Sequence, residues 1–73
     1  MKVMVIANTP NKEKVLEYTE LSLETKVKNN KTYLWYYTKF DARADMADLE
    51  LHGIECEIKR GWENDGFFTI NHK

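Results

Sequence analysis

The segment Lys31–Phe40, KTYLWYYTKF, constrains the fold of this chain more than any other stretch. It holds five of the nine aromatic residues in a chain of 73 residues. Aromatic side chains fit a pleated surface well, so the segment is predicted to be a β-strand. Successive side chains of a strand point to opposite faces, so this strand carries aromatic rings on both of them. The second aromatic face needs an explanation.

Alternation divides this strand into two sets of side chains. The set that holds the aliphatic residue and ends beside a predicted helix is expected to lie under the helices, and it consists of Leu34, Tyr36, Thr38 and Phe40. The other set is expected on an open sheet face, and it consists of Tyr33, Trp35, Tyr37 and Lys39. Neighbouring strands are expected to add Met4, Ile6, Lys26 and Lys28 to this open face.

The N-terminal residues predict a central strand followed by a helix. Val3–Ala7 is a short continuous apolar run, which is typical of a strand buried on both faces. Thr9 is a favoured N-cap residue, and Pro10 is tolerated at the first helical position because its missing N–H has no partner there. We therefore expect a helix over about residues 10–20.

The next segment supports two alternatives. Leu21–Val27 alternates between apolar and polar residues, which predicts a strand over about residues 21–27. If residues 14–27 formed one long strand instead, the chain would be two hairpins around a single helix, in the order ββαββ. Residues 28–31, KNNK, predict a tight hairpin turn because asparagine tolerates positive φ.

A second helix is predicted to begin at Asp41, which would be its N-cap. Ala42, Met46 and Leu49 fall on one face of this helix, and Gly53 stands where a left-handed C-terminal glycine belongs.

Two strands are predicted after this helix. Residues 54–60, IECEIKR, alternate, so that Cys56 points inward with its two isoleucine neighbours and is expected to be a buried core residue. Residues 63–66 predict a second turn, and residues 67–71, FFTIN, are expected to close the sheet as an edge strand.

The predicted order is strand, helix, strand, strand, helix, strand, strand. Its first six elements correspond to the ferredoxin-like split βαβ arrangement (β-α-β-β-α-β), an α+β fold with an antiparallel-rich sheet, and the last strand is an addition. The length and the lack of repeats or linkers predict a single domain over residues 1–73.

No motif points to catalysis. The glycines at positions 53, 61 and 66 form no phosphate-binding loop, and one cysteine with two distant histidines offers no zinc-ligand spacing. We therefore expect a protein that is not an enzyme and that uses no cofactor and no metal.

Two acidic stripes have helical spacing and are interpreted as solvated helix faces, because charge stripes on helices usually face solvent. The stripe on the first helix consists of Glu13, Glu17, Glu20 and Glu24. The stripe on the second helix, for which a divalent cation site is the alternative, consists of Asp41, Asp45, Asp48 and His52.

Charge, cysteine content and the N-terminal residues indicate the cellular compartment and limit the class of partner. The formal net charge of −1 argues against a generic duplex-DNA binder, which usually carries a basic excess. The apolar run of residues 3–7 is too short for a signal-peptide core or a membrane span, and a single cysteine forms no internal disulfide. A cytoplasmic protein is therefore expected.

The size and the single small core resemble those of small accessory or inhibitor proteins of phages and mobile elements. We expect the chain to bind another protein through the open aromatic face, since tyrosine and tryptophan are enriched at interfaces. The alternatives are a single-stranded RNA-binding module that stacks bases on the same face, and a face that is simply core. Unpaired edges recruit other strands, so a homodimer through the last strand is also predicted. The binding residues would be Tyr33, Trp35, Tyr37, Lys39, Lys26 and Lys28.

Overall fold

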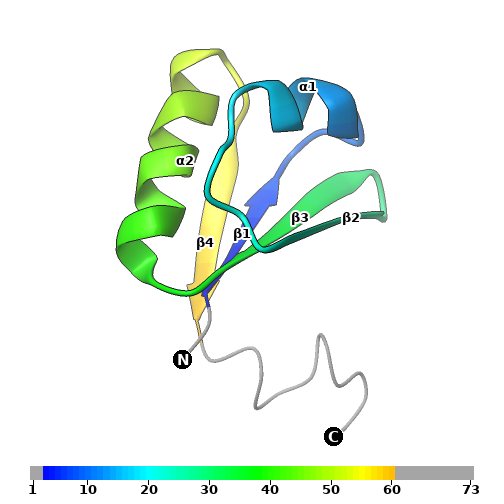
Figure 1. Cartoon of the computed structure of the whole chain (residues 1–73). Helices are drawn as coiled ribbons and strands as arrows, with labels where there is room; N and C mark the ends of the chain where they lie inside the picture. Colours follow the sequence, from blue (N-terminus) through cyan, green and yellow to red (C-terminus); the bar gives the residue numbers. More distant parts are fainter. Residues whose placement is uncertain (1–2, 61–73) are drawn as a thin grey trace, which may run out of the picture.

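The computed structural model describes residues 3–60, and within them two helices cover one side of a four-stranded sheet (Figure 1). The elements are β1 (Val3–Ala7), α1 (Lys12–Glu17), β2 (Glu24–Lys28), β3 (Lys31–Tyr36), α2 (Lys39–Leu51) and β4 (Cys56–Arg60). The sheet is antiparallel throughout, in the order β2-β3-β1-β4. The protein is therefore a small α+β protein, and the alternative with a single helix is wrong. The turn predicted at residues 63–66 and the strand predicted at residues 67–71 lie outside the described residues.

The strand register assigns the side chains of the two central strands to two faces. Met4 lies opposite Trp35 and Ile6 lies opposite Tyr33, so these four residues share one face. The other face packs against the helices and, within β1 and β3, contributes Val3, Val5, Ala7, Leu34 and Tyr36 to the main core. The predicted assignment of β3 side chains to the two faces is therefore confirmed from Tyr33 to Tyr36, the last residue of the strand.

The hairpin between β2 and β3 turns through two asparagines. Asn29 and Asn30 have φ of 55° and 63°, the left-handed region that asparagine tolerates better than most residues. Lys28 and Lys31 face each other across the turn. This is a two-residue hairpin of the primed type, as predicted, and it sets the register of the whole hairpin.

The first helix is shorter than predicted, and Asn11 rather than Thr9 is its N-cap. The Asn11 side chain accepts a hydrogen bond from the Lys14 N–H (3.1 Å). The Thr9 hydroxyl instead accepts from the Asn11 N–H (3.2 Å), so Pro10 lies in the turn before the helix. Asparagine caps a helix at least as well as threonine, and this preference moves the start of the helix by two residues.

The second helix begins earlier than predicted, and its N-cap is Thr38 rather than Asp41. The Thr38 hydroxyl accepts a hydrogen bond from the Asp41 N–H (3.1 Å). β3 therefore ends at Tyr36, and Phe40 lies in the first turn of α2 with 74% of its surface exposed. The prediction that Thr38 and Phe40 lie under the helices is wrong. β3 has ended before Thr38, whose side chain caps α2, and Phe40 follows helical rather than strand periodicity.

Asp45 is not part of a solvated acidic stripe, since it is buried on the core side of α2. Its carboxylate accepts a hydrogen bond from the Tyr36 hydroxyl (2.9 Å). It also accepts from the Glu20 N–H (3.1 and 3.2 Å to its two oxygens) and from the Leu21 N–H (3.0 Å). These contacts hold the connection between α1 and β2 against α2, so β2 begins at Glu24 and not at the predicted residue 21.

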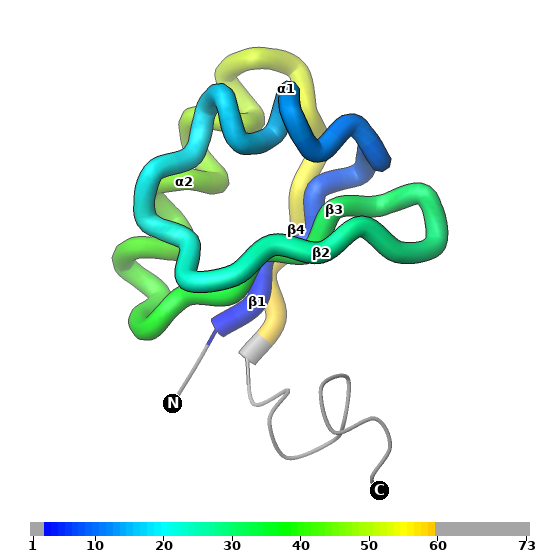
Figure 2. Tube along the Cα trace, turned by 45° about the vertical axis from the view of Figure 1, so that its right-hand side comes forward, coloured from blue at the N-terminus to red at the C-terminus, as the bar shows by residue number. Residues whose placement is uncertain are grey.

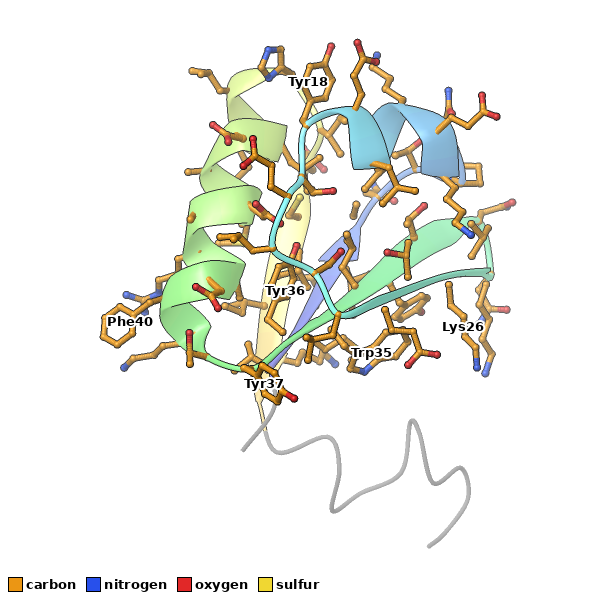
Figure 3. All side chains as sticks on the ribbon, viewed as in Figure 1. Tyr18, Lys26, Trp35, Tyr36, Tyr37 and Phe40 are labelled. Atoms are coloured by element: carbon orange, nitrogen blue, oxygen red, sulfur yellow. The ribbon has the colours of Figure 1, made fainter. Side chains whose placement is uncertain are left out.

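The end of α2 follows the prediction more closely. Gly53 has φ of 83°, and its N–H donates to the Glu50 carbonyl (3.0 Å). Ile54 is buried but precedes β4, which begins at Cys56. Tyr18, just after α1 (labelled in Figure 3), stacks on His52, just after α2, with ring centroids 3.8 Å apart, so the C-terminal ends of the two helices are joined by this ring contact.

Cys56 lies against the core as predicted, but it is half-buried rather than buried. It packs against the helix-side core, and its thiol donates to the Ile54 carbonyl (3.4 Å). Burial, with a smaller contribution from the negative charge of Glu50, raises the pKa of the Cys56 thiol to about 11. The thiol is therefore protonated at neutral pH, the form in which cysteine is a poor nucleophile.

Candidate protein-binding surface

The centre of the sheet face opposite the helices is a compact apolar cluster. It consists of Met4, Ile6, Tyr33 and Trp35, from the two central strands. The rings of Tyr33 and Trp35 are stacked, with centroids 6.4 Å apart and an interplanar angle of 24°. We call this side of the sheet the open face, because both described helices lie on the other side (Figure 1).

Charged residues flank this cluster on both neighbouring strands. Register places Lys26 opposite Tyr33 and Glu24 opposite Trp35. Figure 3 shows Lys26 and Trp35 pointing away from the helices, whereas Tyr36 points toward them. On the other flank, register adds two residues of β4 to the open face, Glu57 and Lys59.

Four of the six predicted binding residues share the open face, namely Tyr33, Trp35, Lys26 and Lys28. The other two, Tyr37 and Lys39, come after the end of β3 and are not in the sheet. Tyr37 follows the end of β3 and exposes 64% of its surface. Lys39 is the first residue of α2, and its ammonium group lies 6.0 Å from the centroid of the Phe40 ring. A binding role for these six residues stays a prediction.

The aromatic rings at the centre of the open face are buried. Trp35 exposes 1% of its surface and Tyr33 exposes 9%. A nucleic-acid base stacks only on a ring face that is exposed, so these two rings are not accessible to stack on bases. The rings therefore contribute to packing, and accessible binding groups have to be sought at the margins of the sheet.

The accessible margin is β2, which forms one edge of the described sheet (Figure 2). In a two-residue hairpin the closing pair exchanges backbone hydrogen bonds, and every second pair does so along the strands. Lys28, Lys26 and Glu24 thus bond to β3, and we infer that Thr25 and Val27 direct their N–H and C=O groups outward. Within residues 3–60, no strand pairs with this side of β2. β4 is the opposite edge of the described sheet, and from Arg60 the chain continues into residues outside the description.

Exposed apolar side chains gather on the segment that leads into this edge. Four of the seven large apolar side chains exposed within residues 3–60 come from residues 16–27, and these are Leu16, Leu21, Leu23 and Val27, with 40–47% of their surface exposed. The Leu23 N–H donates to the Trp35 carbonyl (2.7 Å), so the chain already runs beside β3 before β2 begins. Alternation predicted only that Leu21, Leu23 and Val27 would share one side of a strand, and it did not predict their exposure. We call this segment and the outer side of β2 together the β2 edge.

The buried pair of Tyr36 and Asp45 positions the segment. Burial, and then the hydrogen bond to Asp45, raise the pKa of the Tyr36 hydroxyl far above its ordinary value, so this group stays a proton donor. With Asp45 oriented in this way, its carboxylate holds the backbone of Glu20 and Leu21. The connection is therefore tied to the core at one point, and its leucines remain at the surface.

The end of the sheet where β1 leads toward α1 has shallow polar hollows of about 140 and 350 Å³. Both are lined by Asn8 and Glu55, with Lys31 and Glu57 in the first and Lys14 in the second. Among residues 3–60, no three side chains of His, Cys, Asp or Glu are grouped so as to hold a metal ion. Neither described helix has the length and apolar character needed to cross a membrane.

Comparisons with protein-family models, with curated proteins and with solved structures found no match to this chain.

Proposed function

We propose that this chain is a binding protein, not an enzyme, that it works by contacting another protein, and that the β2 edge is its contact surface. We also propose that its architecture is the ferredoxin-like split βαβ arrangement, which the element order and the antiparallel strand order β2-β3-β1-β4 support. In that arrangement one sheet edge is formed by the second strand, which leaves β2 accessible.

The observation that carries the proposal is the contrast between β2 and the strands beside it. Every residue of β1 is buried, and all of β3 except Lys31 is buried, whereas β2 is largely exposed. Large apolar side chains that are nearly half exposed lie on β2 and on the segment before it, and two lysines of β2 lie on its open-face side. An exposed apolar group rimmed by polar residues is typical of a protein-interaction site.

A protein partner fits this surface better than single-stranded RNA does. The net charge is −1, and the rings that would stack on bases are buried. Phosphate contacts weaken steeply with added salt, whereas apolar contacts do not, so salt dependence separates the two kinds of partner.

The proposal is tested by affinity capture from the native host with wild-type bait and two charged variants. Val27→Asp places a carboxylate in the β2 edge and is expected to lose the specifically captured protein. Leu51→Asp is the matched control, because Leu51 is exposed at the C-terminal end of α2 and is not part of the β2 edge, and it should capture the same protein as wild type. Both are surface substitutions, so their free energies of unfolding should stay within about 0.5 kcal/mol of wild type.

Two results would contradict the proposal. One is capture that nuclease abolishes or that falls steeply with salt, which would indicate a nucleic acid. The other is a captured protein that Val27→Asp retains as well as Leu51→Asp does, which would place the contact elsewhere on the chain.

A further inference from the structure

We infer that the β2 edge accepts an extended segment of the partner as an added β-strand, and that this segment alternates acidic and apolar residues. This inference rests on the proposed function and names the mode of contact and the chemistry of the partner. It is carried by three features of β2: its outward backbone groups, the charges on one face and the apolar residue on the other.

The backbone of β2 supplies the pairing groups. Thr25 and Val27 alternate with the residues that bond to β3, so each presents one N–H and one C=O outward. Strand addition uses such groups for affinity, and the alternating side chains then select the sequence of the added strand.

At the turn end of β2, the open-face side selects for negative charge, whereas Glu24 lies on the same side at the other end of the strand. Lys26 and Lys28 lie there, two residues apart, and Lys31 stands opposite Lys28 across the turn. Residues directly across from Lys26 and Lys28 in an added strand would also be two apart. Opposite charges in cross-strand positions are favourable and like charges are unfavourable, so acidic residues are preferred at both positions.

The helix side of β2 selects for an apolar residue between the two acidic ones. Val27 lies on this side, opposite Thr32, and is nearly half exposed. Leu16 is similarly exposed on α1, the helix that contacts β2. The residue across from Val27 in an added strand would cover this apolar surface, which gives the pattern acidic, apolar, acidic.

A second copy of the chain satisfies this pattern less well. Antiparallel self-pairing centred on Thr25 places Glu24 across from Lys26, but it leaves Lys28 across from Ser22. Self-pairing centred on Lys26 or on Val27 places lysine against lysine. Lysines on an edge strand also discourage pairing with other copies, so a separate acidic segment is the better occupant.

The test uses an NMR titration of the full chain with two peptides. The probe is the acetylated and amidated hexapeptide Glu-Val-Glu-Val-Glu-Val, and the control peptide has lysine in place of each glutamate. The acidic peptide is expected to shift the amide signals of Thr25 and Val27 and to slow their hydrogen exchange. The lysine peptide should bind at least tenfold more weakly.

Two variants make the result specific to β2. Thr25→Pro removes an outward N–H at an edge position that tolerates proline, so it should abolish the shifts. The double variant Lys26→Glu, Lys28→Glu should also abolish them. Its matched control, Lys12→Glu with Lys14→Glu, makes the same change in net charge on the exposed surface of α1 and should leave the shifts intact.

The inference is overturned if the acidic peptide leaves Thr25 and Val27 unshifted, or if both peptides bind equally well. It is also overturned if sedimentation shows a wild-type dimer that Thr25→Pro dissociates, because a second copy would then occupy the edge. If the peptide fails while Val27→Asp still loses the captured protein, only the mode of contact is wrong. If Val27→Asp loses nothing, the proposed function fails as well.

Discussion

The two faces of the sheet are both buried at their centres, yet they are built differently. Among residues 3–60, the helix side joins nine buried residues from both helices, from β1 and β3, and from the loop before β4. They include Tyr36, whose hydroxyl donates a hydrogen bond to the carboxylate of Asp45. On the open face, the buried cluster within residues 3–60 has four members, all from β1 and β3. Because β1 and β3 are buried on both sides whereas β2 is exposed, we place the accessible binding groups on β2 and not at the aromatic centre.

Truncating one large residue on each face of β3 tests whether both faces belong to the core. Trp35→Ala and Leu34→Ala each remove a buried side chain, and each is expected to lower the free energy of unfolding by about 3–5 kcal/mol. Stability in so short a chain is small, so either variant should be largely unfolded. Urea unfolding beside wild type measures both.

If Trp35→Ala instead unfolds at nearly the same urea concentration as wild type while Leu34→Ala is unfolded, the open face is not core. Trp35 would then be free to act as a binding anchor, as the sequence predicts.

The hydrogen bonds of Asp45 on the helix side give a second test. Asp45→Ala leaves the Tyr36 hydroxyl and the N–H groups of Glu20 and Leu21 without their acceptor, which should cost about 2–4 kcal/mol. Asp48→Ala is the control, because Asp48 is exposed on the same helix, and it should change stability by less than about 0.5 kcal/mol. Equal effects of the two substitutions would mean that Asp45 does not hold the connection before β2.

Alkaline pH offers a test without truncating a side chain. Burial raises the pKa of Tyr36 in the folded state, so above about pH 10 the unfolded chain loses a proton that the folded chain keeps. The unfolded state then binds fewer protons, and this group lowers the free energy of unfolding by about 1.4 kcal/mol per pH unit until Tyr36 itself ionises.

Tyr36→Phe removes the titrating hydroxyl. Over the same rise in pH, its free energy of unfolding should therefore fall less than that of wild type. Cys56, whose folded pKa is about 11, contributes in the same direction in both proteins, so their difference isolates Tyr36. Parallel stability curves for the two proteins would contradict a buried, protonated Tyr36.

The smallest expected effect concerns the point where β3 ends. Thr38→Ala removes the hydroxyl that accepts from the Asp41 N–H, and loss of an N-cap costs about 1 kcal/mol. Thermal or urea unfolding measures it, and Asp41→Ala should cost less because Asp41 is not the cap. If Asp41→Ala lowered the free energy of unfolding more than Thr38→Ala, Asp41 would be the N-cap of α2, as the sequence predicted.

The sequence predicted the features that depend on neighbouring residues. Alternation assigned Leu34 and Trp35 to opposite faces, and the paired asparagines predicted the turn that sets the register of β2. These predictions are correct because strand geometry and positive φ act over a few residues.

Features that depend on distant residues were not predictable in this way. Asp45 resembles any acidic residue on a helix until the fold brings it to Tyr36 and to the N–H groups of Glu20 and Leu21, up to 25 residues away. Thr38 fits strand alternation and also fits an N-cap, and only the start of α2 decides between them.

Only part of the β2 edge was predictable from the sequence. Alternation placed Lys26 and Lys28 on the open face correctly. It could not show that Leu21 and Leu23 remain at the surface, because that outcome follows from the contact between Asp45 and the connection before β2.

Amide hydrogen exchange, measured at each residue of β2 in the free protein, tests whether the outer side of β2 is unpaired. We expect slow exchange at Lys26, whose N–H is inferred to bond to β3, and fast exchange at Thr25 and Val27, whose N–H groups are inferred to face outward. If Thr25 and Val27 are protected as strongly as Lys26, the outer side of β2 is already paired and the β2 edge is not free to bind a partner.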